Sequence, residues 1–256
     1  MLLAIDAGNT NVVFAVFERQ TRNLLGEWRV STKRDRTADE YFVWLETLME
    51  REGINDTAIE GAIISTVVPQ LLFNLKTLCH RYFKCEPLIV GEDDLDLGVE
   101  IKATGAGADR LLNAVSAHRS YGGPLIVIDF GTATTFDAVD AEGALLGCVI
   151  CPGVNLSLEA LHMAAAKLPD VPVNKPAKVI GTSTVPAMQS GVYWGYVGMI
   201  EGLVARIKEE YGGDMTVVAT GGLAPLFADA TPVIQHVDSD LTVRGLIDIY
   251  QRNVSV

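Results

Sequence analysis

The stretch that decides the fold is Leu125–Asp137, with the sequence LIVIDFGTATTFD. Four apolar residues run into Asp129, a glycine follows at Gly131, and threonine hydroxyls follow between residues 132 and 135. Turn N–H groups and hydroxyls bind phosphate oxygens, and a nearby carboxylate binds the accompanying metal ion. This stretch therefore predicts a nucleotide-binding turn at the end of a buried strand.

The same pattern opens the chain as LLAIDAGNTNVVFAV, residues 2–16. Identical residues recur at a constant offset of 123 positions in the pairs Ile5/Ile128, Asp6/Asp129, Gly8/Gly131, Ala15/Ala138 and Val16/Val139. Two related units predict two related domains that face each other across a cleft. The alternative is that both stretches are ordinary buried strands with glycine turns. We favour the first interpretation because the acidic residue, the glycine and the hydroxyl residues recur together.

The composition is that of a folded protein of two domains. The chain has 256 residues, of which 49% are hydrophobic and 20% charged, which provides apolar material for real cores. The net charge of −12 argues against binding nucleic acid, which needs clustered Lys and Arg. The N-terminus lacks the basic flank of a signal peptide, and no apolar run reaches the roughly 18 residues of a membrane-spanning helix. We therefore expect a cytoplasmic protein that binds neither nucleic acid nor membrane.

Four cysteines in a chain of this length do not indicate a disulfide framework. Cys148 and Cys151 form a C-x-x-C, which is found in redox sites and in zinc sites. The pair lies in GCVICPG, which is more typical of a strand running into a turn than of a helix N-terminus. Cys79 and Cys85 have the wrong spacing for a second C-x-x-C. We therefore expect all four to be reduced, packed thiols.

Start signals place several helices. Thr37 and Glu40 form a capping box that predicts a helix to about Glu50. Pro69 suits the first position of another helix, directly after a strand at 61–68. We further expect strands at 2–5, 12–17, 24–30, 87–90, 145–150, 215–220 and 232–237, an acidic turn at 92–96, and helices at 111–119, 156–168, 185–210 and 241–250.

The helix at 185–210 has an unusual face. Gly191, Gly195, Gly198 and Gly202 lie at i, i+4, i+7 and i+11, which is one side of the helix. Each glycine costs a helix about 1 kcal/mol relative to alanine, so close packing must compensate. We expect this face to be the interface of a homodimer, and the alternative is a close contact within the chain. A membrane contact is excluded because Glu201 interrupts the apolar run.

The repeated turn, together with a strand that ends in Gly221-Gly222, is similar to the phosphate and adenosine signatures of the actin/hexokinase/Hsp70 ATPase superfamily. Within it, the chain most resembles the type III pantothenate kinases over essentially its whole length. The matching segments are IDAGNTN (5–11), STKRDRTADEY (31–41), ISTVVP (64–69), GADR (107–110), YGGPLIVIDFGTATTFD (121–137), AMQSGVYWGY (187–196), VVATGGLAPLF (217–227) and LTVRGL (241–246). One departure is segment 99–106, which is shorter than is usual in the family and has no aromatic residue.

The resemblance implies an α/β fold of two tandem ribonuclease H-like (actin-like ATPase) domains, residues 1–118 and 119–256, with a nucleotide cleft between them. It implies ATP-dependent phosphorylation of pantothenate to 4'-phosphopantothenate, the first step of coenzyme A biosynthesis. Two other classes stay open: a different small-molecule kinase of this fold, and a non-catalytic regulatory relative. A regulator should have lost some of Asp6, Asp109, Asp129 and Thr132, and all four are present.

The resemblance also implies residue roles. Asp109 is the expected general base, although an ordinary acidic residue in the first turn of a helix has the same sequence signature. Asp6 is expected to hold Mg²⁺ through water, and Asp129 a monovalent cation, K⁺ or NH₄⁺. The implied ATP-binding residues are Asp6, Ala7, Gly8, Asn9, Thr10, Asn11, Val12, Val13 and Thr132. The implied substrate-binding residues are Gly107, Ala108, Asp109, Arg110 and Thr184, the last close to the expected dimer interface.

Overall fold

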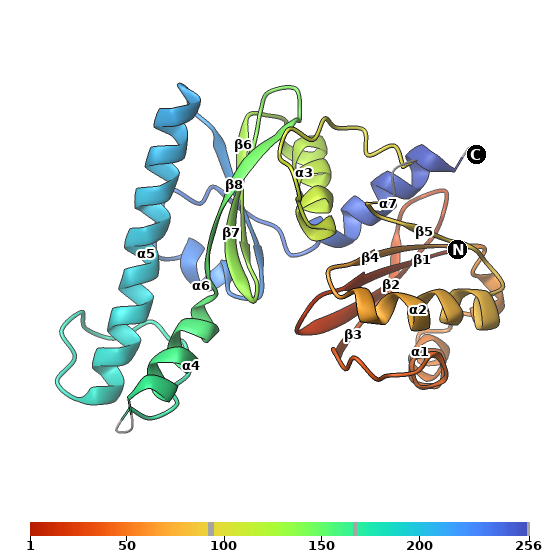
Figure 1. Cartoon of the computed structure of the whole chain (residues 1–256), viewed down its shortest axis with the longest axis horizontal. Helices are drawn as coiled ribbons and strands as arrows, with labels where there is room; N and C mark the ends of the chain where they lie inside the picture. The colour runs from red at the N-terminus through yellow and green to blue at the C-terminus, as the bar shows by residue number, and fades with distance from the viewer. Residues whose placement is uncertain (92–94, 166–167, 255–256) are drawn as a thin grey trace. The chain divides into compact units, whose positions relative to one another are not determined.

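In a computed structural model, which describes residues 1–91, 95–165 and 168–254, the chain forms two five-stranded sheets, each with its own helices (Figure 1). It divides into two compact units, the first made of residues 1–98, 105–116 and 241–256 and the second of residues 99–104 and 117–240. The change of unit at 116–117 lies close to the expected boundary at 118. The C-terminal segment differs from the expected division, because it returns to the first unit.

The first unit contains a mixed sheet in the order β3-β2-β1-β4-β5. Its strands are β1 (Leu2–Ala7), β2 (Asn11–Phe17), β3 (Leu24–Ser31), β4 (Gly61–Thr66) and β5 (Pro87–Ile89). Strands β1, β2 and β3 form antiparallel pairs, whereas β4 runs parallel to β1 and β5 parallel to β4. The carboxyl ends of β1 and β4 therefore lie at the same edge of this sheet.

Two helices pack on one face of the first sheet, where Tyr41, Leu45 and Leu75 join its core. The first, α1 (Ala38–Arg51), has the predicted capping box: the Glu40 N–H donates to Thr37 Oγ1 at 3.3 Å, and the Thr37 N–H donates to Glu40 Oε2 at 2.8 Å. The second, α2 (Pro69–Leu78), begins at Pro69 as predicted and continues into the π-helical turn η2 (Cys79–Phe83). A short 3₁₀ turn, η1 (Asp56–Ala58), precedes β4.

The C-terminal helix α7 (Leu241–Asn253) joins the first unit through very close contacts. A Cβ on Gly61 of β4 would meet the Tyr250 hydroxyl at 2.0 Å. A Cβ on Gly245 would meet the Leu112 carbonyl oxygen at 2.4 Å, in α3 (Ala108–Tyr121). These contacts connect residues that are far apart in the chain, so the local patterns that place the other elements do not predict them.

The second sheet repeats the first in strand order and direction. Its strands are β6 (Leu125–Phe130), β7 (Ala133–Val139), β8 (Leu145–Pro152), β9 (Thr216–Gly221) and β10 (His236–Val237), in the order β10-β9-β6-β7-β8. The predicted duplication is confirmed. The strand expected at 232–237 is reduced to its last two residues. Pro232, at its expected start, has no N–H to donate to a ladder.

The two hairpins differ by one residue. Ala7 pairs with Val12 across the first turn, whereas Phe130 pairs with Thr134 across the second. The offset of 123 therefore holds for β1 and β6, but β2 and β7 correspond at 122. The expected equivalence of Ala15 with Ala138 is wrong by one position, because the second turn is one residue shorter.

Three further helices belong to the second unit: α4 (Val154–Ala164), α5 (Thr184–Tyr211) and α6 (Ala224–Ala228). Helix α4 is shorter than the predicted 156–168, of which residues 166–167 lie outside the described part of the chain, as do residues 92–94 of the predicted acidic turn. Tyr193 and Ile200 of α5 pack on the strand residues Ile126 and Phe130. Within the described residues, no helix is long and apolar enough to cross a membrane.

The glycine face of α5 points away from that core. Among the described residues, nothing lies within 4 Å of a Cβ built on Gly191, Gly195 or Gly198. A Cβ on Gly202 meets only the Arg206 side chain, one turn further along the same helix, at 3.2 Å. The alternative of a tight contact with another element of the same chain is therefore wrong.

Candidate active site

The first predicted phosphate turn lies at the end of β1. The Gly8 N–H donates to the Asn11 carbonyl at 2.9 Å and closes the turn, which leaves Asn9 and Thr10 exposed. Thr32 braces the turn twice: its hydroxyl donates to the Gly8 carbonyl at 2.7 Å, and its N–H donates to the Thr10 carbonyl at 2.9 Å. Hence a short rigid segment presents amide and hydroxyl groups to solvent.

The flanks of this turn are less accessible. Ala7 and Val12 have fully buried side chains, and Val12 and Val13 pair with both neighbouring strands. A ligand approaching this stretch therefore meets residues 8–11 first. Asp6 is the one residue of β1 that is neither buried nor fully exposed, and Asp129 occupies the same place in β6, which has the same burial pattern.

Each of these aspartates has a hydroxyl residue beside it on the adjacent parallel strand. Asp6 is paired with Ser65 of β4, and Asp129 with Thr220 of β9. Ser65 is fully buried, and its hydroxyl has no hydrogen-bond partner among the described residues. Neither hydroxyl was predicted as a site residue, because strand pairing over such sequence distances has no local signal. Both residues could have been identified by a search for hydroxyl side chains near the carboxyl ends of the predicted parallel strands.

The N-terminus of α3 lies close to the end of β4. The Val67 N–H donates to the Ala7 carbonyl at 3.2 Å, and a Cβ on Gly107 would lie 3.5 Å from the Val67 side chain. Helix α3 begins at Ala108, three residues before the predicted 111–119, and it has Asp109 in its first turn, as predicted. The structure thus brings the Gly107–Arg110 segment to the strand end where Asp6 lies, within the first unit.

Asp109 has a defined orientation. Its Oδ1 accepts a hydrogen bond from the Arg110 N–H at 2.8 Å, and a Cβ on Gly107 would come within 2.7 Å of the same oxygen. Unpaired N–H groups at a helix start favour a carboxylate there. Glycine at position 107 leaves one side of this carboxylate open, which suits a group that must approach a substrate hydroxyl.

The second predicted phosphate turn lies at the end of β6. The Gly131 N–H donates to the Ala133 carbonyl at 3.0 Å, and Gly131 and Thr132 are exposed. Of the threonines that follow, Thr134 is fully buried and faces the core, whereas Thr135 lies opposite Asp129 in the ladder. Only part of the predicted hydroxyl series is therefore accessible, with Thr132 at the tip of the turn.

Glycines allow the backbone to pack against this second turn. A Cβ on Gly153, before α4, would meet the Thr132 carbonyl at 2.2 Å. Gly221, at the end of β9, has φ +90°, and a Cβ there would meet the Phe130 carbonyl at 2.6 Å. A Cβ on Gly222 would have nothing within 4 Å among the described residues. Of the glycine pair, Gly222 is the one with room for a ligand.

Thr184, the remaining predicted substrate residue, is the first residue of α5 and is exposed. It belongs to the second unit, whereas Gly107–Arg110 belong to the first. The described residues contain no group of three or more His, Cys, Asp or Glu side chains arranged to hold a metal. Mg²⁺ bound through one protein carboxylate, ATP phosphates and water needs no such group.

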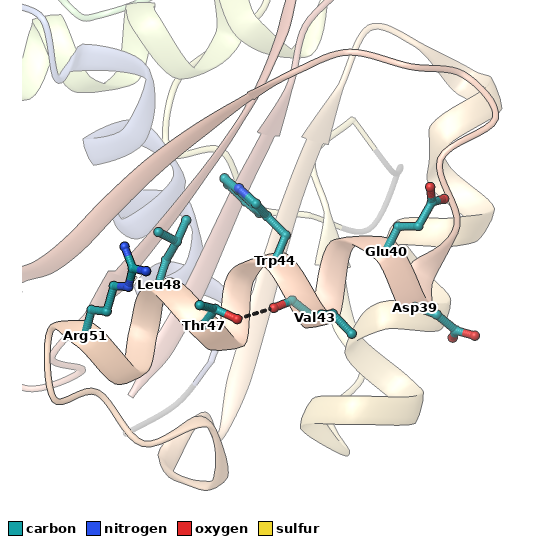
Figure 2. A pocket seen from close by; sticks show the side chains of 7 residues that line it. All are labelled: Asp39, Glu40, Val43, Trp44, Thr47, Leu48 and Arg51. Carbon is teal, nitrogen blue, oxygen red and sulfur yellow. Dashed lines mark hydrogen bonds between the residues drawn. The ribbon is translucent and has the colours of Figure 1, made fainter.

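A hollow of about 640 Å³ lies along α1 and involves none of the predicted site residues (Figure 2). All its lining residues, Asp39, Glu40, Val43, Trp44, Thr47, Leu48 and Arg51, come from this one helix. The Thr47 hydroxyl donates to the Val43 carbonyl at 2.8 Å, so it is already engaged within the helix. We assign no function to this hollow.

The cysteines correct one expectation. Cys79 is buried and Cys85 and Cys151 are half-buried, but Cys148 is exposed on β8, so it is not a packed thiol. Residues three apart on a strand point to opposite faces. Cys148 and Cys151 lie opposite Asp137 and Thr134 respectively, so the C-x-x-C does not bring its two thiols together.

Comparison with known proteins identifies the family. The family model described as type III pantothenate kinase matches residues 2–206. The chain belongs to the type III pantothenate kinase family. It is 65% identical to the type III pantothenate kinase of Paramagnetospirillum magneticum, over 99% of this chain and 98% of that protein. It is 60% identical to that of Rhodospirillum rubrum, over 99% of each.

Solved structures agree on the fold. The activator of the 2-hydroxyisocaproyl-CoA dehydratase from Clostridium difficile, with bound ADPNP, has a TM-score of 0.57 at 14% identity and covers 100% of this chain and 98% of its own. Together with the repeated sheet order, this likeness supports the predicted α/β, actin-like fold. At this identity the likeness concerns the fold alone.

Proposed function

We propose that this protein transfers the γ-phosphoryl group of ATP to the primary hydroxyl of pantothenate and forms 4'-phosphopantothenate for coenzyme A biosynthesis. The observation that carries the proposal is membership in the type III pantothenate kinase family over most of the chain. The two Asp–Gly turns, each at the end of the central strand of one sheet, give the reaction its phosphate-binding elements.

The phosphate-binding groups come from both turns. Asn9 and Thr10 of the first turn and Thr132 of the second are exposed and offer polar groups, which bind phosphate oxygens without adding charge. Asp6 holds Mg²⁺ through water, since Mg²⁺ prefers oxygen ligands and retains several of its waters. The transition state of phosphoryl transfer is loose, so positioning and charge neutralisation provide most of the rate.

Asp129 binds a monovalent cation, K⁺ or NH₄⁺. This carboxylate lies half-buried between Thr135 and Thr220, whose hydroxyls offer further oxygens on adjacent strands. A weakly hydrated cation held there would neutralise phosphate charge near the second turn. If the cation has this role, turnover should be lost when both K⁺ and NH₄⁺ are withheld.

Asp109 is the general base for the pantothenate hydroxyl. The hydrogen bond from the Arg110 N–H orients it, and Gly107 leaves space beside it. In a loose transition state the hydroxyl loses its proton late, so orientation of the hydroxyl matters more than a strong base. The other residues that we assign to substrate binding are Gly107, Ala108, Arg110 and Thr184. The guanidinium group of Arg110 is suited to bind the pantothenate carboxylate.

The protein works as a homodimer joined through the glycine face of α5. Gly191, Gly195 and Gly198 leave open space on the side of the helix opposite its core residues. Large exposed apolar side chains lie on and around the N-terminal part of this helix and on α4, namely Leu156, Leu161, Met163, Val179, Ile180 and Val185. Apolar exposure of this extent is typical of a protein interface.

We assign the protein to the cytoplasm, where ATP is available. Its net charge of −12 disfavours nucleic acid as a partner. The second candidate function is phosphorylation of another small alcohol on the same fold. A panel of hydroxyl substrates offered with ATP distinguishes the two by kcat/KM.

The test is a coupled ADP-release assay run with and without pantothenate and with and without K⁺. We expect ADP release only when pantothenate and the monovalent cation are both present. The control for surface mutation is Glu210→Gln, which changes an exposed residue. It leaves Asp6, Asp109, Asp129 and Thr132 unchanged. Absence of pantothenate-dependent release in the wild-type protein would overturn the proposal.

A further inference from the structure

Two cysteines outside the candidate active site are held together by the turn at the end of α2. Cys79 begins η2 and is fully buried, whereas Cys85 follows the turn and is half-buried. The Cys79 carbonyl accepts hydrogen bonds from the N–H groups of both Lys84 and Cys85, the latter at 3.3 Å. Lys84 has φ 57°, a left-handed conformation that turns the chain back toward Cys79.

The two thiols also interact through a hydrogen bond. This bond lowers the pKa of the Cys85 thiol, because it stabilises the thiolate. The same bond, together with burial, raises the pKa of the Cys79 thiol. The thiolate is the form of cysteine that attacks disulfides, so the partly accessible residue is also the more nucleophilic one.

We propose that Cys79 and Cys85 form a reversible intrachain disulfide, with Cys85 as the attacking thiol and Cys79 as the resolving thiol. The oxidant is a low-molecular-weight disulfide such as oxidised glutathione. The Cys85 thiolate attacks one sulfur of the oxidant, and the other sulfur leaves as a thiolate. Cys79 then loses its proton to solvent and attacks Cys85 Sγ, which expels the second thiolate. Two protein thiols are oxidised, and one disulfide of the oxidant is reduced to two thiols.

The geometry distinguishes this pair from the C-x-x-C. Residues three apart on a strand are about 10 Å apart and face opposite sides, beyond the reach of about 7 Å between Cα atoms in a disulfide. Cys148 and Cys151 have that arrangement on β8. The backbone hydrogen bond from Cys85 to Cys79 instead brings two residues that are six apart in sequence next to each other.

The experiment incubates the purified full-length protein with oxidised glutathione, blocks remaining thiols with N-ethylmaleimide, and maps tryptic peptides without reduction. Trypsin cuts after Lys76, Arg81 and Lys84, so the disulfide joins peptide 77–81 to the peptide that begins at Cys85. We expect this joined pair to be the main oxidised product and to disappear on treatment with dithiothreitol. Cys148 should stay blocked by N-ethylmaleimide.

Two variants separate the roles of the thiols. In Cys79→Ala, glutathione should remain attached to Cys85, because the resolving thiol is missing. In Cys85→Ser, neither a disulfide nor a glutathione adduct should form at Cys79. Because Cys85 is only half-buried, we expect this variant to fold. A stable glutathione adduct on Cys85 in the wild-type protein, or oxidation of Cys148 ahead of the pair, would overturn the proposal.

Discussion

The carbonyl oxygen of Thr132 accepts a hydrogen bond from the Gly153 N–H at 3.1 Å. This bond ties the second phosphate turn to the segment that leads into α4. The approach is so close that a Cβ on Gly153 would lie 2.2 Å from that oxygen. The turn is therefore fixed by backbone contacts on one side, and the Thr132 side chain stays exposed on the other.

Replacement of Thr132 by valine tests its assignment to ATP. The variant keeps the shape of the side chain but loses the hydroxyl, and a hydrogen bond to a charged group contributes about 2 kcal/mol. We expect the KM for ATP to rise roughly tenfold or more. The matched control is Thr134→Val, because the buried Thr134 hydroxyl has no hydrogen-bond partner in the described residues. It should leave the kinetics unchanged, and equal effects in both variants would contradict the assignment.

Replacement of Asp109 by asparagine should remove turnover and spare ATP binding. A positioned general base contributes at least roughly a hundredfold to the rate, and the amide cannot accept the proton. Turnover is measured by ADP release, and ATP binding by isothermal titration calorimetry. Asp39→Asn is the control, because Asp39 is also a first-turn carboxylate, in α1. Near-normal turnover of Asp109→Asn would remove the base assignment.

The dimer proposal predicts the behaviour of Gly198→Leu. A leucine there meets open space in a single chain, so the fold should persist, and replacement of a helical glycine favours the helix by up to about 1 kcal/mol. At an interface the same leucine would hold two helices apart. Size-exclusion chromatography with light scattering should show a monomer for Gly198→Leu and a dimer for the control Glu210→Leu. A dimer in both cases would place the interface elsewhere.

The stability of the second unit should fall at acid pH because of Asp140. Burial of this carboxyl would raise its pKa, but hydrogen bonds from Lys102 at 2.8 Å and from the Ala144 N–H at 2.7 Å outweigh burial and lower the pKa. A lowered folded-state pKa stabilises the fold fully above the ordinary value of about 3.9, and the stabilisation is lost as the pH falls through the lowered pKa.

Asp140→Asn should therefore lower the free energy of unfolding by about 2 kcal/mol at neutral pH. The difference from the wild-type protein should begin to shrink below about pH 4 and should disappear as the pH falls through the lowered pKa, where the folded wild-type carboxyl becomes protonated as well. Urea unfolding at several pH values measures both effects. Asp214→Asn, which removes an exposed partner of Lys208, is the control and should change stability little. A difference that does not depend on pH would contradict the role of the charge.

The elements of this fold could be predicted where the signal is local. The Thr37/Glu40 capping box and Pro69 place the starts of α1 and α2 to the residue. The repeated Asp–Gly turn predicts the duplicated sheet. The same match misaligns β2 and β7 by one position, because sequence identity does not reveal that one turn is a residue shorter.

Features that depend on distant pairing could not be predicted. Ser65 lies beside Asp6 only because β4 runs parallel to β1, and Thr220 lies beside Asp129 for the same reason in the second sheet. The return of α7 to the first unit depends on its close fit against Gly61. The contact between Cys79 and Cys85 depends on a left-handed Lys84, a conformation that the sequence does not signal, since glycine and asparagine are the residues that usually adopt it.

Phosphorus NMR of the reaction mixture tests the central claim most directly. With ATP, Mg²⁺, K⁺ and pantothenate present, the γ-phosphoryl signal of ATP should be replaced by a phosphomonoester signal in equal amount to the ADP formed. The product should have the mass of 4'-phosphopantothenate. Appearance of the γ-phosphoryl group as inorganic phosphate, with pantothenate unchanged, would contradict the account.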